Sequence, residues 1–276
     1  MDIAQMDPDL YIPGAQTNQN GMTVFVYGIA GTWKTSWAGS WPSPVFLSSG
    51  TEGGDDALAM LPSLTGKPTP PVYRIDSSAM LSNKVEFISR NYERFGWKTV
   101  VLDSLTFMSD TWIAEIVGAR IRAAMAANKP DANTQMQQRD WGFLENFFVK
   151  DIAQTLHRTK LNVIWIALER ELTETKPNGE MTVVGRRPYV QGGMRTKIPA
   201  MCKLIIHAEK TFTSDPQNPS RRLVKPIYWT SPSWMTPDIR HKYGGAFPEG
   251  KLVDPQYGDW PTFDAVNSRL GQFIYQ

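Results

Sequence analysis

One stretch of this sequence combines the residue types that bind a phosphate chain. Residues 24–36 read Val-Phe-Val-Tyr-Gly-Ile-Ala-Gly-Thr-Trp-Lys-Thr-Ser, which predicts an apolar strand, a glycine-bearing turn and a helix that Lys-Thr opens. Backbone N–H groups, a helix N-terminus and one cation together bind phosphate well. We therefore expect a nucleotide to be bound by Gly28, Gly31, Thr32, Trp33, Lys34, Thr35 and Ser36. In this pattern the lysine reaches the terminal phosphates, and the threonine hydroxyl binds Mg²⁺.

The stretch departs from the P-loop pattern G-x-x-x-x-G-K-[ST] at one position. Trp33 precedes the lysine, where the pattern has glycine. An indole there must turn away from the phosphates or it blocks them. The structural alternative is a strand-turn-helix corner with a solvated lysine.

Two carboxylates follow later predicted strands. Asp103 ends the apolar run that begins at Lys98 and would hold Mg²⁺ together with Thr35. The alternative role for Asp103 is to cap the next helix. Glu52 follows the second predicted strand, where a general base could orient water against the γ-phosphate. Its alternative is a solvated loop acid.

The composition bounds the class of protein. With 276 residues, the chain is long enough for a sizeable core, and a net charge of +2 excludes a global basic field. Any contact with nucleic acid must therefore come from a local patch. The single cysteine, Cys202, excludes an internal disulfide framework and fits a buried apolar role. No signal peptide or membrane span is evident, so we expect a cytoplasmic protein, in host cytoplasm if a phage encodes it.

Apolar strands and amphipathic helices alternate through residue 168, which predicts an α/β fold with a mostly parallel sheet flanked by helices. The predicted strands are 22–27, 45–49, 72–76, 98–102 and 162–168. Residues 50–56, 128–139 and 169–197 are predicted loops, and two late antiparallel strands follow around the turn at 214–219. We divide the chain into an N-terminal arm (1–21), one core domain (22–245) and a tail with a short helix (246–276).

The order of these motifs resembles the RecA-like core ATPases, and among them the short phage-encoded single-strand annealing and recombination proteins. The likeness covers residues 22–245 and depends on Gly28…Lys34-Thr35, Glu52 after the second strand, Leu102-Asp103-Ser104, Trp141 opening a helix, and the strand 162–168. The resemblance implies ATP and Mg²⁺ as cofactors, a ring or filament of identical subunits, and single-stranded DNA as ligand. A single-strand-binding protein is a further candidate partner.

The resemblance also implies two DNA-contacting loops, matched here by 128–139 and 169–197. Residues 170–197 carry six basic and three acidic side chains, a local charge of +3, together with a tyrosine that could stack on bases. The candidate DNA contacts are Arg186, Arg187, Tyr189, Arg195 and Lys197. The alternative is an ordinary solvated loop.

A basic finger that enters the neighbouring subunit's ATP site is a third implication, matched here by Arg240 and Lys242. A cation supplied in trans would stabilise the charge on the transferring phosphoryl group. Relatives often carry an uncharged polar or histidine sensor where this strand ends in Leu168-Glu169. That departure and Trp33 leave open a second function, a DNA-binding assembly factor with a degenerate loop and no hydrolysis. A helicase-like ring motor and a small-molecule kinase are the remaining alternatives.

Overall fold

A computed structural model of the chain describes residues 21–49, 54–128, 135–215, 218–233, 235–241 and 251–252. In chain order, its elements are β1 (Thr23–Gly28), α1 (Lys34–Gly39), β2 (Pro44–Ser49), α2 (Gly54–Ala59), α3 (Leu61–Thr65), β3 (Val72–Ile75), α4 (Ser78–Phe95), β4 (Thr99–Asp103), α5 (Leu105–Ala126), α6 (Gln138–Asn146), the π-helix η2 (Phe147–Ala153), α7 (Gln154–His157), β5 (Asn162–Thr175), β6 (Met181–Pro188), α8 (Met194–Met201), β7 (Leu204–Asp215), β8 (Asn218–Trp229) and β9 (Arg240–His241).

The strands form a mixed sheet in the order β3-β2-β4-β5-β1-β7-β8. The pairs from β3 to β7 are all parallel, whereas β7 and β8 are antiparallel. β5 therefore lies between β1, which leads into the lysine loop, and β4, which ends at Asp103. This is the predicted α/β architecture: a mostly parallel sheet with late antiparallel strands.

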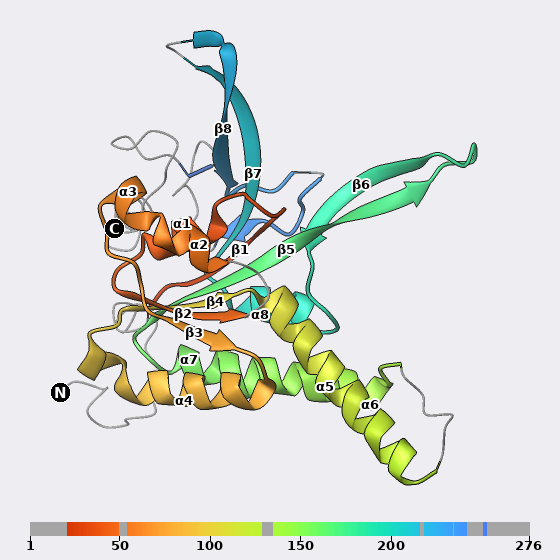
Figure 1. Ribbon diagram of the computed structural model, residues 1–276. Helices are drawn as coiled ribbons and strands as arrows, with labels where there is room; N and C mark the ends of the chain where they lie inside the picture. Colours follow the sequence, from red (N-terminus) through yellow and green to blue (C-terminus); the bar gives the residue numbers. More distant parts are fainter. Residues whose placement is uncertain are drawn as a thin grey trace, which may run out of the picture.

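Helices cover both faces of the sheet (Figure 1). Alternate residues of a strand point to opposite faces, so β1 supplies Val24 and Val26 to one core and Phe25 and Tyr27 to the other. The first core is closed by α1, α2 and α3, and the second by α4, α5, α6, η2, α7 and α8. Burial on both faces explains why these strands read as continuous apolar runs.

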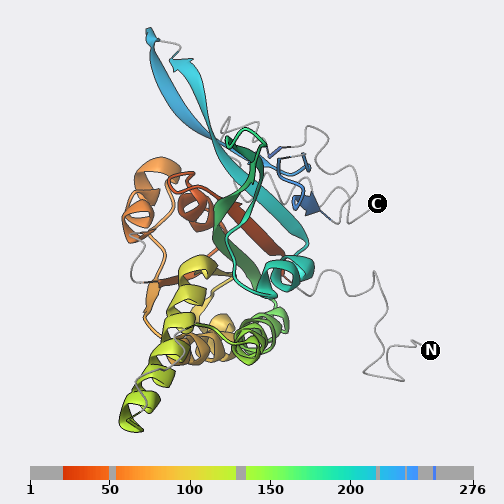
Figure 2. The ribbon, with the colours of Figure 1, turned by 90° about the vertical axis from the view of Figure 1, so that its right-hand side faces the viewer.

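Two long hairpins extend beyond this body (Figure 1), and the one formed by β7 and β8 also projects clearly in Figure 2. One is formed by β7 and β8, and the other by β6 with the second half of β5. The large side chains exposed on them include Met181 and Phe212, at 68% and 63% of their surface. The hairpins therefore gain little stability from a core of their own.

The structure corrects three expected loops. Residues 169–188 are mostly strand, because β5 runs on to Thr175 and pairs with β6. Helix α2 begins at Gly54 inside the expected acidic loop, and α6 begins at Gln138 inside the expected polar loop. The arm at 1–20 and the helix expected near Phe263–Phe273 lie outside the described residues.

Cys202 is buried, as expected for an apolar role. No helix in the described part of the chain has the length and apolarity to cross a bilayer.

Candidate nucleotide site

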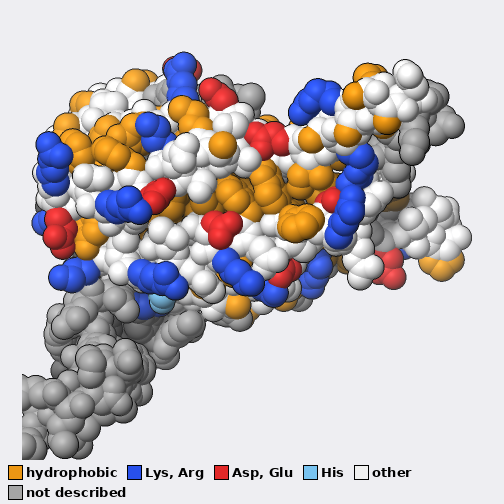
Figure 3. Space-filling view, turned by 90° about the horizontal axis from the view of Figure 1, so that it is seen from below, with side chains coloured by type: hydrophobic (Ala, Val, Ile, Leu, Met, Phe, Trp, Pro, Cys, Tyr) orange, Lys and Arg blue, Asp and Glu red, His pale blue; other side chains and the backbone are white. Residues whose placement is uncertain are grey.

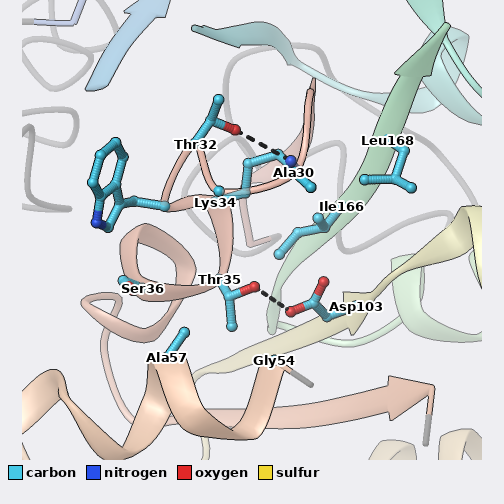
Figure 4. A pocket seen from close by; sticks show the side chains of 12 residues that line it. Ala30, Thr32, Lys34, Thr35, Ser36, Gly54, Ala57, Asp103, Ile166 and Leu168 are labelled. Carbon is cyan, nitrogen blue, oxygen red and sulfur yellow. Dashed lines mark hydrogen bonds between the residues drawn. The ribbon is translucent and has the colours of Figure 1, made fainter. Parts of the chain in front are cut away.

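Thr35 and Asp103 meet at the carboxyl edge of the sheet. The Thr35 Oγ1 hydroxyl donates a hydrogen bond of 2.6 Å to Oδ2 of Asp103. Thr35 stands in the first turn of α1, and Asp103 is the last residue of β4, where it is 5% exposed. Figure 4 shows the two side chains pointing toward each other across the pocket. The two side chains that the sequence analysis assigned to one Mg²⁺ site therefore lie within hydrogen-bond distance, while their role in binding a metal stays a prediction.

Lys34 is folded over its own loop. Its Nζ donates to the carbonyl oxygens of Gly28 (2.9 Å) and Ile29 (2.8 Å) and to Thr32 Oγ1 (3.2 Å). The side chain is 7% exposed, so an ammonium group is kept in a nearly dry loop by three oxygen acceptors. Thr32 Oγ1 in turn donates to the carbonyl of Ile29 at 2.9 Å, which braces the loop from within.

The backbone of Trp33 explains why a glycine suits this position. Trp33 caps α1 in the left-handed conformation, with φ 57° and ψ 22°. An L-residue adopts that conformation only at a cost in free energy, whereas glycine does not. The carbonyl of Trp33 accepts hydrogen bonds from Trp37 N (2.8 Å) and from the Tyr228 hydroxyl (3.2 Å). These bonds fix the backbone in the conformation that glycine would take freely.

These groups line a cavity of about 410 Å³. Its walls are Ala30, Gly31, Thr32, Trp33, Lys34, Thr35, Ser36, Gly54, Ala57, Asp103, Ile166 and Leu168. Of the residues expected to bind nucleotide, only Gly28 stands outside the lining, and its carbonyl still holds the Lys34 amine. The volume is within the usual range for ligand sites.

The oxygen donors at the site suit Mg²⁺. This ion prefers a few protein oxygens and takes its remaining ligands from phosphate and water. The Thr35 hydroxyl and the Asp103 carboxylate provide two such oxygens side by side. Among the described residues, no group of three or more His, Cys, Asp or Glu side chains forms a metal site of another kind.

The side of the cavity opposite the loop is formed by residues that the sequence did not indicate. Gly54, the first residue of α2, lies so close that a Cβ there would be 3.3 Å from Asp103 Oδ2. Ile166 and Leu168 come from β5 and add an apolar wall. The glycine pair at 53–54 could have indicated a close approach at Gly54. The position of β5 beside β1 depends on the strand order, which no local sequence pattern indicates.

Three of the expected catalytic residues have no described side chain. Glu52 and Lys242 lie outside the described residues. Arg240 belongs to the short strand β9, whose backbone pairs with β7 at Ile205. Their predicted roles as general base and as finger in trans stay predictions.

A second polar cluster, formed by Glu169 of β5, Arg186 of β6, and His207 and Glu209 of β7, lies near the end of β1. His207 Nε2 and Glu169 Oε2 are 2.6 Å apart, with both side chains buried. Arg186 lies 3.7 Å from Glu169, 3.6 Å from Glu171 and 3.5 Å from Glu209. Glu169 and His207 come from β5 and β7, so this contact joins two strands that lie on either side of β1.

The residues expected to contact DNA are dispersed over two elements. Arg186 and Arg187 lie on β6, and Arg195 and Lys197 lie on α8. Tyr189 follows β6, and its N–H bonds the carbonyl of Leu168 at 2.7 Å, directly behind the cavity wall. Arg187 pairs with Asp238 at 3.5 Å, and Lys197 pairs with Glu145.

The sheet order, the loop around Lys34 and the Thr35–Asp103 pair define a P-loop nucleotide-binding protein of the ATPase type. The family model described as "AAA domain" matches residues 20–237, and the chain belongs to that AAA domain family. No curated protein matches the chain.

Proposed function

We propose that the protein is a Mg²⁺-dependent ATPase that binds single-stranded DNA as a homo-oligomer in phage recombination or replication, with strand annealing as its task. The observation that supports the ATPase most directly is the hydrogen bond between Thr35 and Asp103 beside the Lys34 loop. In P-loop enzymes this set of groups binds the β- and γ-phosphates and Mg²⁺, which neutralises the charge that develops during phosphoryl transfer.

Each residue of the candidate site has its own task in this proposal. When a nucleotide binds, the Lys34 ammonium leaves the carbonyl oxygens of its own loop and donates to phosphate oxygens instead. Neutral hydrogen-bond acceptors are thereby replaced by charged ones. Thr35 and Asp103 hold the metal, which acts as a Lewis acid on the phosphate oxygens when bound. Glu52 is our candidate for the base that orients water, with Arg240 and Lys242 as candidate cations from the neighbouring subunit. Turnover would then depend on assembly.

DNA binding rests on composition and on the resemblance to single-strand annealing ATPases. Residues 170–197 carry a local charge of +3, and both hairpins extend from the sheet edge at which β1 leads into the loop that lines the cavity. The helical face seen from below carries Lys and Arg interspersed with Asp and Glu around a hydrophobic band (Figure 3). A mixed face of this kind favours DNA contact on the side of the hairpins instead.

The candidate DNA contacts differ in whether their side chains are already paired with carboxylates. Arg186 faces three carboxylates, so a phosphate would have to displace them. Arg195 has no ion pair with any described residue. We therefore expect Arg195→Ala to weaken single-stranded DNA binding and lower its salt dependence, whereas Arg186→Ala lowers mainly the thermal stability.

The rate of ATP hydrolysis with and without single-stranded DNA tests the proposal, in the wild type and in Lys34→Ala. Stimulation by DNA that disappears in the variant supports it. Tight DNA binding without turnover in either protein would support the alternative of an annealing or assembly factor with a degenerate loop. Turnover stimulated by a metabolite would indicate a small-molecule kinase, and DNA unwinding coupled to turnover a helicase-like ring motor.

A further inference from the structure

Lys210 reaches the nucleotide loop from a different strand. A Cβ built on Gly31 would lie 2.9 Å from Lys210 Nζ and 3.5 Å from its Cε, so the amine lies directly beside the Gly31 backbone. β7 runs parallel to β1 from Val24↔Leu204 to Tyr27↔His207. Lys210 therefore stands just past the point where β1 ends and the loop leaves the sheet.

The backbone that carries Lys210 is fixed against this loop. A Cβ on Gly28 would be 2.1 Å from the carbonyl oxygen of Ala208, so only glycine allows the two strands to approach this closely. On β8, Tyr228 lies opposite Ala208 and donates its hydroxyl to the carbonyls of Thr32 (3.3 Å) and Trp33 (3.2 Å). The ring of Tyr228 stacks on Trp37 of α1, with centroids 5.5 Å apart. The base of the hairpin and the loop thus form one packed unit.

The surroundings leave the charge of Lys210 available. Among the residues that the structure describes, Lys210 has neither an ion pair nor a hydrogen bond. The adjacent acid, Glu209, is already engaged by Arg186 at 3.5 Å and by Trp229 Nε1 at 2.9 Å. The ammonium groups of Lys210 and Lys34 both lie at this loop, so an anion bound there could interact with two positive charges.

We propose that Lys210 is a second cation of the nucleotide site, contributed in cis from β7, which binds the phosphate chain from the side of Gly31 while Lys34 binds it from within the loop. This inference rests on the proposed nucleotide binding and adds a binding residue to it. The ligand class is a nucleoside di- or triphosphate, because two ammonium groups can pair with two adjacent phosphates, whereas a monophosphate offers only one.

Equilibrium titration with ATP, ADP and AMP tests the role of Lys210 on the full chain. The variants are Lys210→Gln, which keeps most of the aliphatic stem, Lys210→Arg, which keeps the charge, and Lys34→Ala. Lys176→Ala is the matched control, since that lysine pairs with Glu180 far out on the other hairpin. Thermal melting of each variant checks that it folds.

We expect Lys210→Gln to raise the Kd for ATP and ADP by about tenfold or more, as for loss of one charged hydrogen bond. Lys210→Arg should stay close to the wild type, and AMP binding should not change. Wild-type affinity in Lys210→Gln, beside a clear loss in Lys34→Ala, would overturn the role of Lys210 and leave the nucleotide site intact. A wild-type protein that binds no ATP would overturn both.

Discussion

Thr35 Oγ1 and Asp103 Oδ2, 68 positions apart in sequence, lie 2.6 Å apart at the carboxyl edge of the sheet. This contact joins the start of α1 to the end of β4, and in the proposed function the two oxygens share one Mg²⁺. Thr35→Ala should therefore lower the hydrolysis rate at least tenfold and raise the Mg²⁺ concentration needed for half-maximal rate. Thr35→Ser, which keeps the hydroxyl, is the matched control. An unchanged Mg²⁺ dependence in Thr35→Ala would contradict the shared site.

Trp33 occupies a left-handed backbone position, with φ 57°. Trp33→Gly and Trp33→Ala both remove the indole, but only glycine also removes the Cβ that makes this conformation costly. We expect the glycine variant to unfold with a free energy about 1 kcal/mol higher than the alanine variant. Denaturant titration measures the difference. The glycine variant should hydrolyse ATP as fast as the wild type or faster, and a large loss of rate would indicate an active role for the indole.

Tyr228 supports the nucleotide loop from β8 through two carbonyl oxygens. Tyr228→Phe removes both hydrogen bonds and leaves the ring stacked on Trp37, so it should cost about 1 kcal/mol of stability and weaken ATP binding severalfold. Tyr27→Phe is the control, because the buried Tyr27 hydroxyl has no hydrogen-bond partner among the described residues. Removal of the Tyr27 hydroxyl should leave the free energy of unfolding unchanged or raise it. Equal ATP affinities for the two variants would argue against a role for β8 in shaping the loop.

Asp140 joins the start of α6 to α5. The backbone N–H of Gln137, at 2.7 Å, and then the guanidinium of Arg120 stabilise the carboxylate and hold the pKa of Asp140 below its ordinary value. A lowered pKa in the folded state gives stability that is present above the ordinary pKa of about 4 and is lost as the pH falls through the folded-state pKa.

Asp140→Asn should therefore lower the melting temperature at neutral pH, and the difference from the wild type should shrink as the pH falls below about 4. Asp151→Asn is the comparison, because Asp151 is exposed on η2 and should show little effect at any pH. A difference for Asp140→Asn that persists at low pH would show that the side chain contributes by packing alone.

The sequence predicted the sheet and the loop side of the site because their signals are local. Apolar runs, glycine positions and the Lys34-Thr35 pair depend on neighbouring residues, and strand ends such as Asp103 fall on one edge of a parallel sheet by construction. Local residue type also decides where α4 ends, because its C-cap Gly96 takes a left-handed φ of 68° that glycine adopts freely.

The remaining features depend on contacts between distant segments. The hairpin of β5 and β6 looked like a loop because its strands are exposed and polar, so the apolar alternation that indicates a strand is absent. Lys210 and Tyr228 lie beside the loop, and Glu169 beside His207, only because of the strand order β5-β1-β7-β8. Their roles can therefore be inferred from the assembled sheet but not from the neighbouring residues in the sequence.

A crystal structure with a non-hydrolysable ATP analogue and Mn²⁺ in place of Mg²⁺ tests the central claim most directly. The triphosphate should lie against the loop from Gly28 to Lys34, with the anomalous signal of Mn²⁺ at the Thr35 hydroxyl and the Asp103 carboxylate nearby. An analogue bound elsewhere, or a loop that stays closed on Lys34 at saturating analogue, would contradict it.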